Sequence, residues 1–203
     1  MLLWINGAFG VGKTQTAFEL QRRLPNAHVA DPEFIGYGIH RMLPASARVD
    51  FQDRPQWRSA VVATLTDAAE AHDGTVLVPM TLVDAEYFDE IMSGLERNSI
   101  GLQHFSLTAS PATLRRRLRA RAGYRLGRLV GRDESWALAQ IDRCVAALAA
   151  DRFATHVDTD DRGLDDVVEF IAERAGLELE APRLSTLRYQ ARRVAVAVRH
   201  IHV

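Results

Sequence analysis

The 203-residue sequence has almost no lysine, because only Lys13 among its 25 Lys and Arg residues is a lysine. It also contains a single cysteine, Cys144, which excludes an intrachain disulfide. No apolar run approaches the roughly 20 residues that are needed to span a bilayer. The opening M-L-L-W-I-N-G has no basic leader and reaches glycine too soon for a signal peptide. These absences predict a cytoplasmic protein.

The composition is that of a globular chain, with 47% apolar and 25% charged residues and a net charge of -1. The charge is unevenly distributed. Residues 111–132 hold eight Arg, residues 183–203 hold five, and neither segment has an acidic residue. Such segments predict an anionic partner, with solvated helix faces as the alternative. The slightly acidic balance and the lack of a recognisable binding motif argue against nucleic acid as that partner.

A glycine-rich motif, G-A-F-G-V-G-K-T at 7–14, lies between a strand expected at Leu2–Asn6 and a helix expected at 13–24. In this context the pattern predicts a P-loop that binds ATP and Mg²⁺. We expect backbone N–H groups to hold the phosphates, the Lys13 ammonium to reach the β- and γ-phosphates, and the Thr14 hydroxyl to bind Mg²⁺. The expected ATP site comprises Gly7, Ala8, Phe9, Gly10, Val11, Gly12, Lys13, Thr14 and Gln15.

Apolar segments alternate with helical patterns along the rest of the chain, which is typical of a parallel sheet covered on both faces. Further strands are expected at 28–31, 75–80, 102–107 and 154–158, and helices at about 33–43, 55–72, 84–97, 111–122, 134–150 and 163–175. The predicted fold class is α/β, a P-loop NTPase of the nucleoside- or shikimate-kinase type with a five-stranded parallel sheet. We expect a kinase-like domain over 1–181, with a substrate-binding insert at about 33–72 and an Arg-rich lid at about 114–134.

A carboxylate, Asp31, ends the second predicted strand, and Glu33 follows closely. In small-molecule kinases a carboxylate at this place can take the proton of the acceptor hydroxyl. The alternative is that Asp31 only caps the helix that begins at Pro32. The next strand, T-V-L-V-P-M-T, ends without the Asp that many P-loop NTPases use for the metal, which argues against a motor or switch ATPase.

The segment L-R-R-R-L-R-A-R at 114–121 places Arg117 and Arg121 on one helix face. We expect these arginines to bind phosphate when the following glycine-rich loop closes over ATP. Arg125 and Arg128 on the loop, and Arg143 in the next helix, are further candidates. The expected catalytic residues are Lys13, Asp31, Arg117 and Arg121.

The insert contains D-F-Q-D-R-P-Q-W-R at 50–58, in which Phe51 and Trp57 can stack on a base or sugar. Packing in the core is the alternative for both rings. The polar side chains of the same segment can hydrogen-bond a substrate. The expected substrate-binding residues are Asp31, Glu33, Phe51, Asp53, Arg54, Trp57, Arg58 and Thr81.

Residues 182–203 are expected to form a basic amphipathic helix, because apolar residues recur there at spacings of three and four. Such a helix can lie on an anionic membrane surface, at the inner face of the membrane. The alternative is that the same stripe packs on the body of the protein or on a second subunit in a homodimer. The pattern leaves both open.

Several segments resemble the tunicamycin-resistance proteins of the TmrB type. They are W-I-N-G-A-F-G-V-G-K-T-Q-T-A-F-E-L at 4–20, D-P-E at 31–33, D-F-Q and P-Q-W-R within 50–58, V-P-M-T at 78–81, E-Y-F at 86–88 and Q-I-D-R-C-V at 140–145. The resemblance implies ATP binding, resistance to the nucleoside antibiotic tunicamycin, and membrane association through the C-terminal segment. It favours transfer of the γ-phosphate to a drug hydroxyl. The alternatives are ATP-dependent sequestration of the drug at the membrane without chemistry, and a nucleoside or metabolite kinase with another substrate.

Overall fold

The computed structural model describes residues 1–120 and 135–185, together with Arg188, Arg192 and Val196. Its centre is a five-stranded sheet in the order β2-β3-β1-β4-β5, in which all neighbouring strands pair in parallel. The predicted fold class is confirmed. The strands are β1 (Leu2–Gly7), β2 (Ala27–Val29), β3 (Thr75–Pro79), β4 (Leu102–Thr108) and β5 (His156–Asp158).

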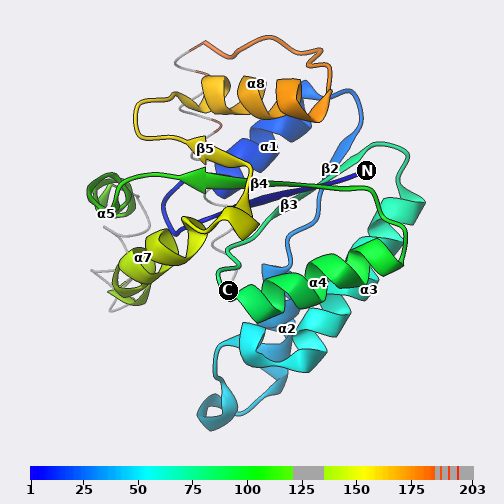
Figure 1. The fold of residues 1–203 in the computed structure, drawn as a ribbon, viewed down its shortest axis with the longest axis vertical. Helices are drawn as coiled ribbons and strands as arrows, with labels where there is room; N and C mark the ends of the chain where they lie inside the picture. Colours follow the sequence, from blue (N-terminus) through cyan, green and yellow to red (C-terminus); the bar gives the residue numbers. More distant parts are fainter. Residues whose placement is uncertain (121–134, 186–187, 189–191, 193–195, 197–203) are drawn as a thin grey trace.

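Helices cover both faces of this sheet. One face carries α1 and α8, which pack side by side, and the other carries α3, α4 and α7 (Figure 1). Strands β1 and β3 are buried along their whole length, which is why their sequences are mostly apolar rather than alternating. The helices are α1 (Lys13–Arg23), α2 (Glu33–Met42), α3 (Pro55–Ala71), α4 (Ala85–Arg97), α5 (Pro111–Arg119), α7 (Ser135–Leu148) and α8 (Leu164–Ala175).

Short signals in the sequence explain where several helices begin. The Asp84 carboxylate accepts from the N–H groups of Glu86 and Tyr87, and the Ser110 hydroxyl accepts from the N–H of Thr113. Pro55 and Pro111 occupy first-turn positions, where proline's missing N–H costs nothing. These caps place the helix starts within a residue or two of the predicted positions. The short 3₁₀ helices are η1 (Ala45–Ala47), η2 (Phe51–Asp53) and η3 (Asp151–Phe153).

A buried asparagine, Asn6, joins the carboxyl ends of β1 and β3. Its amide nitrogen donates to the Leu82 carbonyl at 2.8 Å, and its amide oxygen accepts from the N–H groups of Leu82 and Gly7 at 3.0 and 2.8 Å. Every polar atom of this side chain is therefore used to hold the two segments together. Because Gly7 opens the glycine-rich loop, Asn6 positions that loop against the segment after β3.

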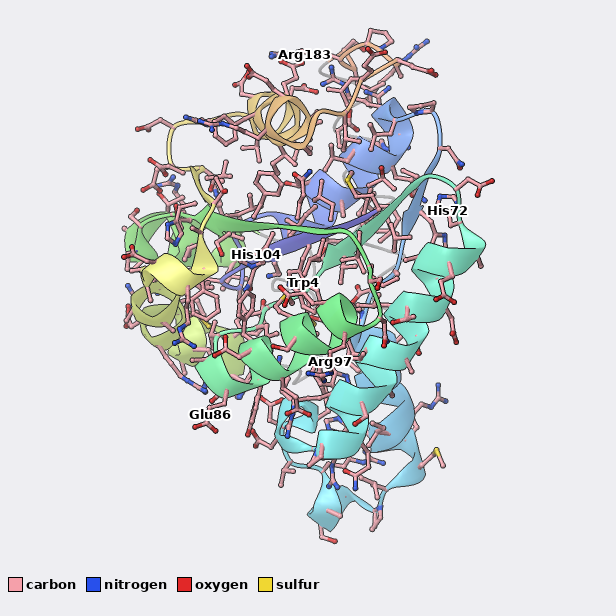
Figure 2. The ribbon with its side chains drawn as sticks, turned by 45° about the vertical axis from the view of Figure 1, so that its right-hand side comes forward. Trp4, His72, Glu86, Arg97, His104 and Arg183 are labelled. Atoms are coloured by element: carbon pink, nitrogen blue, oxygen red, sulfur yellow. The ribbon has the colours of Figure 1, made fainter. Side chains whose placement is uncertain are left out.

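A buried arginine, Arg23, ties the end of α1 to α8 and to residues 179–183. Its side chain is 7% exposed and donates to the Ala181 carbonyl, to Asp165 at 3.2 Å and to Glu169 at 2.9 Å. Arg183 pairs with Asp166 and with the same Glu169 from outside, beside α8 (Figure 2). The segment after α8 thus returns to the helix that follows the glycine-rich loop.

Replacing Arg23 by Met is expected to lower the free energy of unfolding by about 2 kcal/mol, because the hydrogen bonds that the buried guanidinium donates to Asp165, Glu169 and the Ala181 carbonyl are lost. Arg183→Met is the matched control. It removes a partner of the same Glu169 carboxylate at a half-exposed position, where an ion pair contributes little. Chemical denaturation of both variants measures the difference. Equal losses would show that burial at Arg23 has no special role.

Two described residues near the C-terminus, Arg192 and Val196, are packed against other parts of the chain. The Arg192 guanidinium donates to the Phe18 carbonyl at 3.0 Å, its Nε lies 3.7 Å from the Glu19 carboxylate, and Val196 is 5% exposed. These contacts support packing of the segment on the body of the protein, one of the two alternatives that the sequence left open. Among the described residues, no helix is both long and apolar enough to cross a membrane.

Membrane contact by residues 183–203 stays a prediction with a direct test. The full chain and a form ending at Pro182 are sedimented with anionic liposomes at low and high salt. Membrane binding predicts that only the full chain pellets, and only at low salt, since each basic residue contributes on the order of 1 kcal/mol near such a surface. Packing on α1 predicts instead that both forms stay in the supernatant and that the shorter one unfolds at a lower temperature.

Candidate functional site

The loop between β1 and α1 has the backbone of an anion-binding loop. Gly7, Gly10 and Gly12 have φ angles of 146°, 88° and 115°, and Gly12 is the N-cap of α1. A φ of 115° is strained for any residue with a Cβ, so glycine is required where the loop enters the helix. The first turn of α1 contains no acidic residue. The backbone N–H groups at this helix N-terminus and the helix dipole therefore favour a bound phosphate.

Helix α5 packs directly on this loop. A Cβ added to Gly10 would lie 2.9 Å from the Leu118 Cγ and 3.2 Å from the Leu114 carbonyl oxygen, so only glycine allows the approach. Arg117, on the same helix, donates to the Val11 carbonyl at 3.4 Å and to the Thr159 hydroxyl at 2.9 Å. The Thr159 carbonyl accepts from it as well.

The structure thus places Arg117 beside the loop, as its predicted role requires, while its contact with phosphate stays a prediction. Its partner Thr159, which follows β5, was missed because nothing in the sequence connects two residues so far apart. Arg121, Arg125 and Arg128 lie outside the described residues. Arg143 lies on α7, where its Nη1 donates to Gln140 on the same helix.

Lys13 points back over the loop. Its ammonium donates to the Ala8 carbonyl at 3.3 Å and lies 5.6 Å from the centre of the Phe9 ring. Phe9 in turn contacts Trp136 of α7 edge to face, with ring centres 5.1 Å apart, and Trp136 is 56% exposed. The start of α7 therefore borders the loop. Trp136 is a neighbour of the loop that was not predicted from the sequence.

Asp31 follows β2 and is half-buried. Burial raises its pKa from 3.8 to about 7, with a further rise from the nearby Glu33 charge. The hydrogen bond from the Glu33 N–H and the charge of Lys13 act in the opposite direction. A carboxylate whose pKa lies near neutral pH is suited to accept and release a proton.

The capping alternative for Asp31 is also visible. Its Oδ1 accepts from the Glu33 N–H at 2.9 Å, and Glu33 is the first residue of α2. The N-cap position itself is occupied by Pro32, so Asp31 holds the start of the helix from one residue further out. The two interpretations of Asp31 are therefore compatible, because one oxygen can hold the start of α2 while the carboxyl group as a whole titrates near neutrality. The Lys13 charge lowers the pKa of Asp31, so the carboxylate and the loop lysine interact electrostatically.

Two predicted substrate residues belong to the core instead. Trp57 is 0% exposed, and its Nε1 donates to the Pro32 carbonyl at 3.2 Å, so its ring cannot stack on a ligand. Arg58 is 8% exposed, pairs with Glu90 and donates to the Gln52 carbonyl at 2.7 Å. Its guanidinium also lies over the Tyr87 ring. Both predictions were wrong, because side chains from η2, α3 and α4 enclose this part of the insert.

Thr81 is likewise structural. It is 3% exposed, and its hydroxyl donates to the Gly7 carbonyl at 2.9 Å, while its own carbonyl accepts from Gln52 at 2.9 Å. The predicted contact with substrate is therefore wrong for this hydroxyl. Thr81 instead connects the glycine-rich loop to η2, which fixes the position of the insert relative to the loop.

The other insert residues are differently placed. Phe51 is half-buried between Tyr37, His40 and Trp57, with ring centres 6.3, 5.5 and 5.3 Å away. Asp53 is exposed and accepts from the Tyr87 hydroxyl at 3.3 Å. Arg54 donates to the Ala47 carbonyl at 2.6 Å. Their substrate contacts stay predictions.

Tyr37 is a further residue that the sequence reading missed. It lies one turn after Glu33 on α2, and its hydroxyl donates to the Glu33 carboxylate at 2.8 Å. Burial and the charges of Glu33 and Asp31 raise the pKa of this phenol, so it remains a proton donor at neutral pH. The spacing of four residues on a predicted helix was the available signal.

The comparisons with known proteins agree with this geometry. A family model described as an AAA domain matches residues 2–150. Among solved structures, the tunicamycin resistance protein of Deinococcus radiodurans is 30% identical, with a TM-score of 0.73, and the match covers 89% of this chain and 99% of that one. No curated protein matches the sequence.

More distant structures show the same fold. Shikimate kinase from Bacteroides thetaiotaomicron is 19% identical with a TM-score of 0.57, covering 87% of this chain and 99% of that one. A gluconokinase from Sinorhizobium meliloti is 17% identical with a TM-score of 0.57, covering 86% and 93%. The fold and the loop therefore define a kinase-like P-loop protein that binds a nucleotide. Within that class, the chain belongs to the tunicamycin resistance proteins.

Proposed function

We propose that this protein transfers the γ-phosphate of ATP to a hydroxyl of tunicamycin. The observation that carries the proposal is Asp31, a carboxylate with a pKa of about 7 that lies within the electrostatic reach of Lys13. A base of this kind beside a phosphate-binding loop is what transfer to a hydroxyl requires. The name of the relative from D. radiodurans supports tunicamycin as the acceptor.

The loop residues fit ATP and Mg²⁺. A Cβ added to Gly12 would meet no atom within 4 Å, so the N-terminus of α1 faces open space of the kind that a phosphate needs. Backbone N–H groups of residues 8–14 would hold the phosphates, with the Lys13 ammonium beside them, and the Thr14 hydroxyl would bind Mg²⁺. The cofactor supplies the phosphoryl group, and its charge in turn favours the positive end of α1.

The residues of this chain then handle the acceptor. Asp31 orients the hydroxyl and takes its proton as the oxygen bonds to phosphorus and the bond to the leaving ADP oxygen breaks. Arg117, held by Thr159 and the Val11 carbonyl, brings a second positive charge to the same loop. Tunicamycin joins a uracil nucleoside to amino sugars, so it offers hydroxyls to this site, and the half-buried Phe51 ring offers a surface for the base.

Mass spectrometry of tunicamycin tests the proposal. After incubation with the full chain and Mg-ATP, we expect the drug to gain the mass of one phosphoryl group and ADP to appear in equal amount. A non-hydrolysable ATP analogue serves as the control and should leave the drug unchanged. If the mass stays constant with ATP while equilibrium dialysis shows drug retained by the protein, sequestration replaces phosphoryl transfer.

A further inference from the structure

The Tyr37 side chain, which belongs to the insert, lies between the Phe51 ring and the Glu33 carboxylate. Its hydroxyl donates to the Glu33 Oε2 at 2.8 Å, and its ring meets Phe51 edge to face, at an interplanar angle of 81°. Phe51 lies against the backbone of α2 at Gly36, where an added Cβ would come within 2.5 Å of the ring. The missing side chain of Gly36 therefore lets Phe51 brace the face of α2 that carries Tyr37.

Glu33 is the link between Tyr37 and Asp31. Its backbone N–H donates to the Asp31 carboxylate at 2.9 Å, so the two acidic residues lie in the same backbone turn. A glutamate in the first turn of a helix has several rotamers, which place its charge in different positions. The Tyr37 hydrogen bond selects one of these rotamers, in which the Glu33 charge acts on Asp31.

We propose that Tyr37 is a positioning residue that fixes the Glu33 carboxylate beside Asp31, and that it thereby tunes Asp31 as the proton acceptor. The effect of Tyr37 on catalysis rests on the proposed function. The contacts among Tyr37, Glu33 and Asp31 do not depend on which molecule accepts the phosphoryl group. Tyr37 acts through Glu33 and is not itself required to touch substrate or ATP.

The charged groups around Asp31 give the expected direction. Among the described residues, Glu33 and Tyr37 of α2 and Lys13 of α1 interact with it electrostatically. The Glu33 charge raises the pKa of Asp31, and the Lys13 charge lowers it. If Glu33 is released, the raising influence weakens while burial and Lys13 remain. Loss of the Tyr37 hydroxyl should therefore lower the pKa of Asp31 without abolishing its elevation.

The test is a titration of Asp31 by carboxyl-carbon NMR in the full chain, with the wild type, Tyr37→Phe, Glu33→Gln and the double variant. Assignment uses the signal that disappears in Asp31→Asn. We expect Tyr37→Phe and Glu33→Gln each to lower the Asp31 midpoint by about half a unit, a roughly threefold change in proton affinity. The double variant should match Glu33→Gln, because Tyr37 acts only through Glu33.

Tyr87→Phe is the matched control. It removes another tyrosine hydroxyl that donates to a carboxylate, Asp53, and it should leave the Asp31 midpoint unchanged. The proposal fails if Tyr37→Phe leaves the midpoint at the wild-type value, if Glu33→Gln does so, or if the two effects add in the double variant. Tunicamycin plays no part in this titration, so a drug that gains no phosphoryl group would refute the proposed acceptor and leave this result unaffected.

A second readout separates positioning from a purely structural role. For phosphoryl transfer, the acidic limb of the pH profile of kcat/KM should move to lower pH in Tyr37→Phe, following the Asp31 midpoint. A structural role would lower the rate at every pH without moving the limb. A lower rate at every pH with an unmoved limb would therefore overturn the proposal.

Discussion

Phosphoryl transfer is expected to fall by at least about 100-fold when Lys13 is replaced by Arg, although the charge is conserved. The ammonium reaches the Ala8 carbonyl and lies 5.6 Å from the Phe9 ring, so it sits within the curve of the loop. A guanidinium is planar and wider, and its forked donors cannot take the place of a compact point charge between two phosphates. All the remaining Lys and Arg residues of the chain are arginines, so the single lysine indicates that an ammonium is needed at this position.

The measurement is drug turnover by mass spectrometry, together with ATP affinity by calorimetry. Arg97→Lys, at the exposed end of α4, is the control and should behave as the wild type (Figure 2). This control replaces an arginine by a lysine, the reverse of the test substitution, at a position far from the loop. Full activity of Lys13→Arg would mean that the loop does not bind phosphate in the way proposed.

Asp31→Asn is expected to keep ATP binding and to lower phosphoryl transfer by about 100-fold or more, the usual scale for loss of a general base. Asparagine can still accept the hydrogen bond from the Glu33 N–H, so the start of α2 should remain in place. What the amide cannot do is take a proton. Turnover measured at saturating ATP therefore isolates the chemical role of Asp31.

Asp84→Asn is the matched control, because Asp84 is also a capping carboxylate but lies at the start of α4. Its turnover should stay within about twofold of the wild type. If Asp31→Asn instead loses ATP affinity while bound complexes react at the normal rate, Asp31 would be a metal or structural ligand rather than the base.

The same substitution should make the protein more stable at alkaline pH. The pKa of Asp31 is raised from 3.8 to about 7 on folding, so the folded protein holds this proton more tightly than the unfolded chain does. The resulting stability is complete below about pH 3.8 and is lost as the pH rises through 7. Asparagine mimics the neutral form at every pH and escapes that loss.

We therefore expect Asp31→Asn to raise the free energy of unfolding at pH 8 by on the order of 2 kcal/mol, and the gain to vanish near pH 4. Thermal melts of both proteins across this range measure it. An equal gain at every pH would point to a cause other than the ionised carboxylate.

Much of the fold follows from local patterns. Continuous apolar segments such as Leu2–Gly7 mark strands that are buried on both faces, and the caps at Asp84 and Ser110 mark where helices begin. The glycine-rich loop follows from spacing alone, because its chemistry needs backbone N–H groups and one lysine within eight residues. These features depend on neighbours in the sequence, which is why they were predictable.

The substrate insert was predicted less well for the opposite reason. Trp57, Arg58 and Thr81 were assigned to substrate because aromatic and polar side chains near a site often bind ligands. Whether such a side chain reaches a ligand depends on what covers it, and in each case the cover comes from another element. The Pro32 carbonyl takes the Trp57 N–H, Glu90 takes the Arg58 guanidinium, and the Gly7 carbonyl takes the Thr81 hydroxyl.

The sequence by itself determined the parallel α/β fold, the phosphate-binding loop with its single lysine, and a carboxylate at the end of the second strand. All of these depend on periodicity or spacing within short segments. Only the tertiary structure decided that Arg117 meets Thr159 at the loop and that Thr81 supports Gly7. The physical reason is distance along the chain: Thr81 and Gly7 are 74 positions apart, and their hydrogen bond forms only after the strands align.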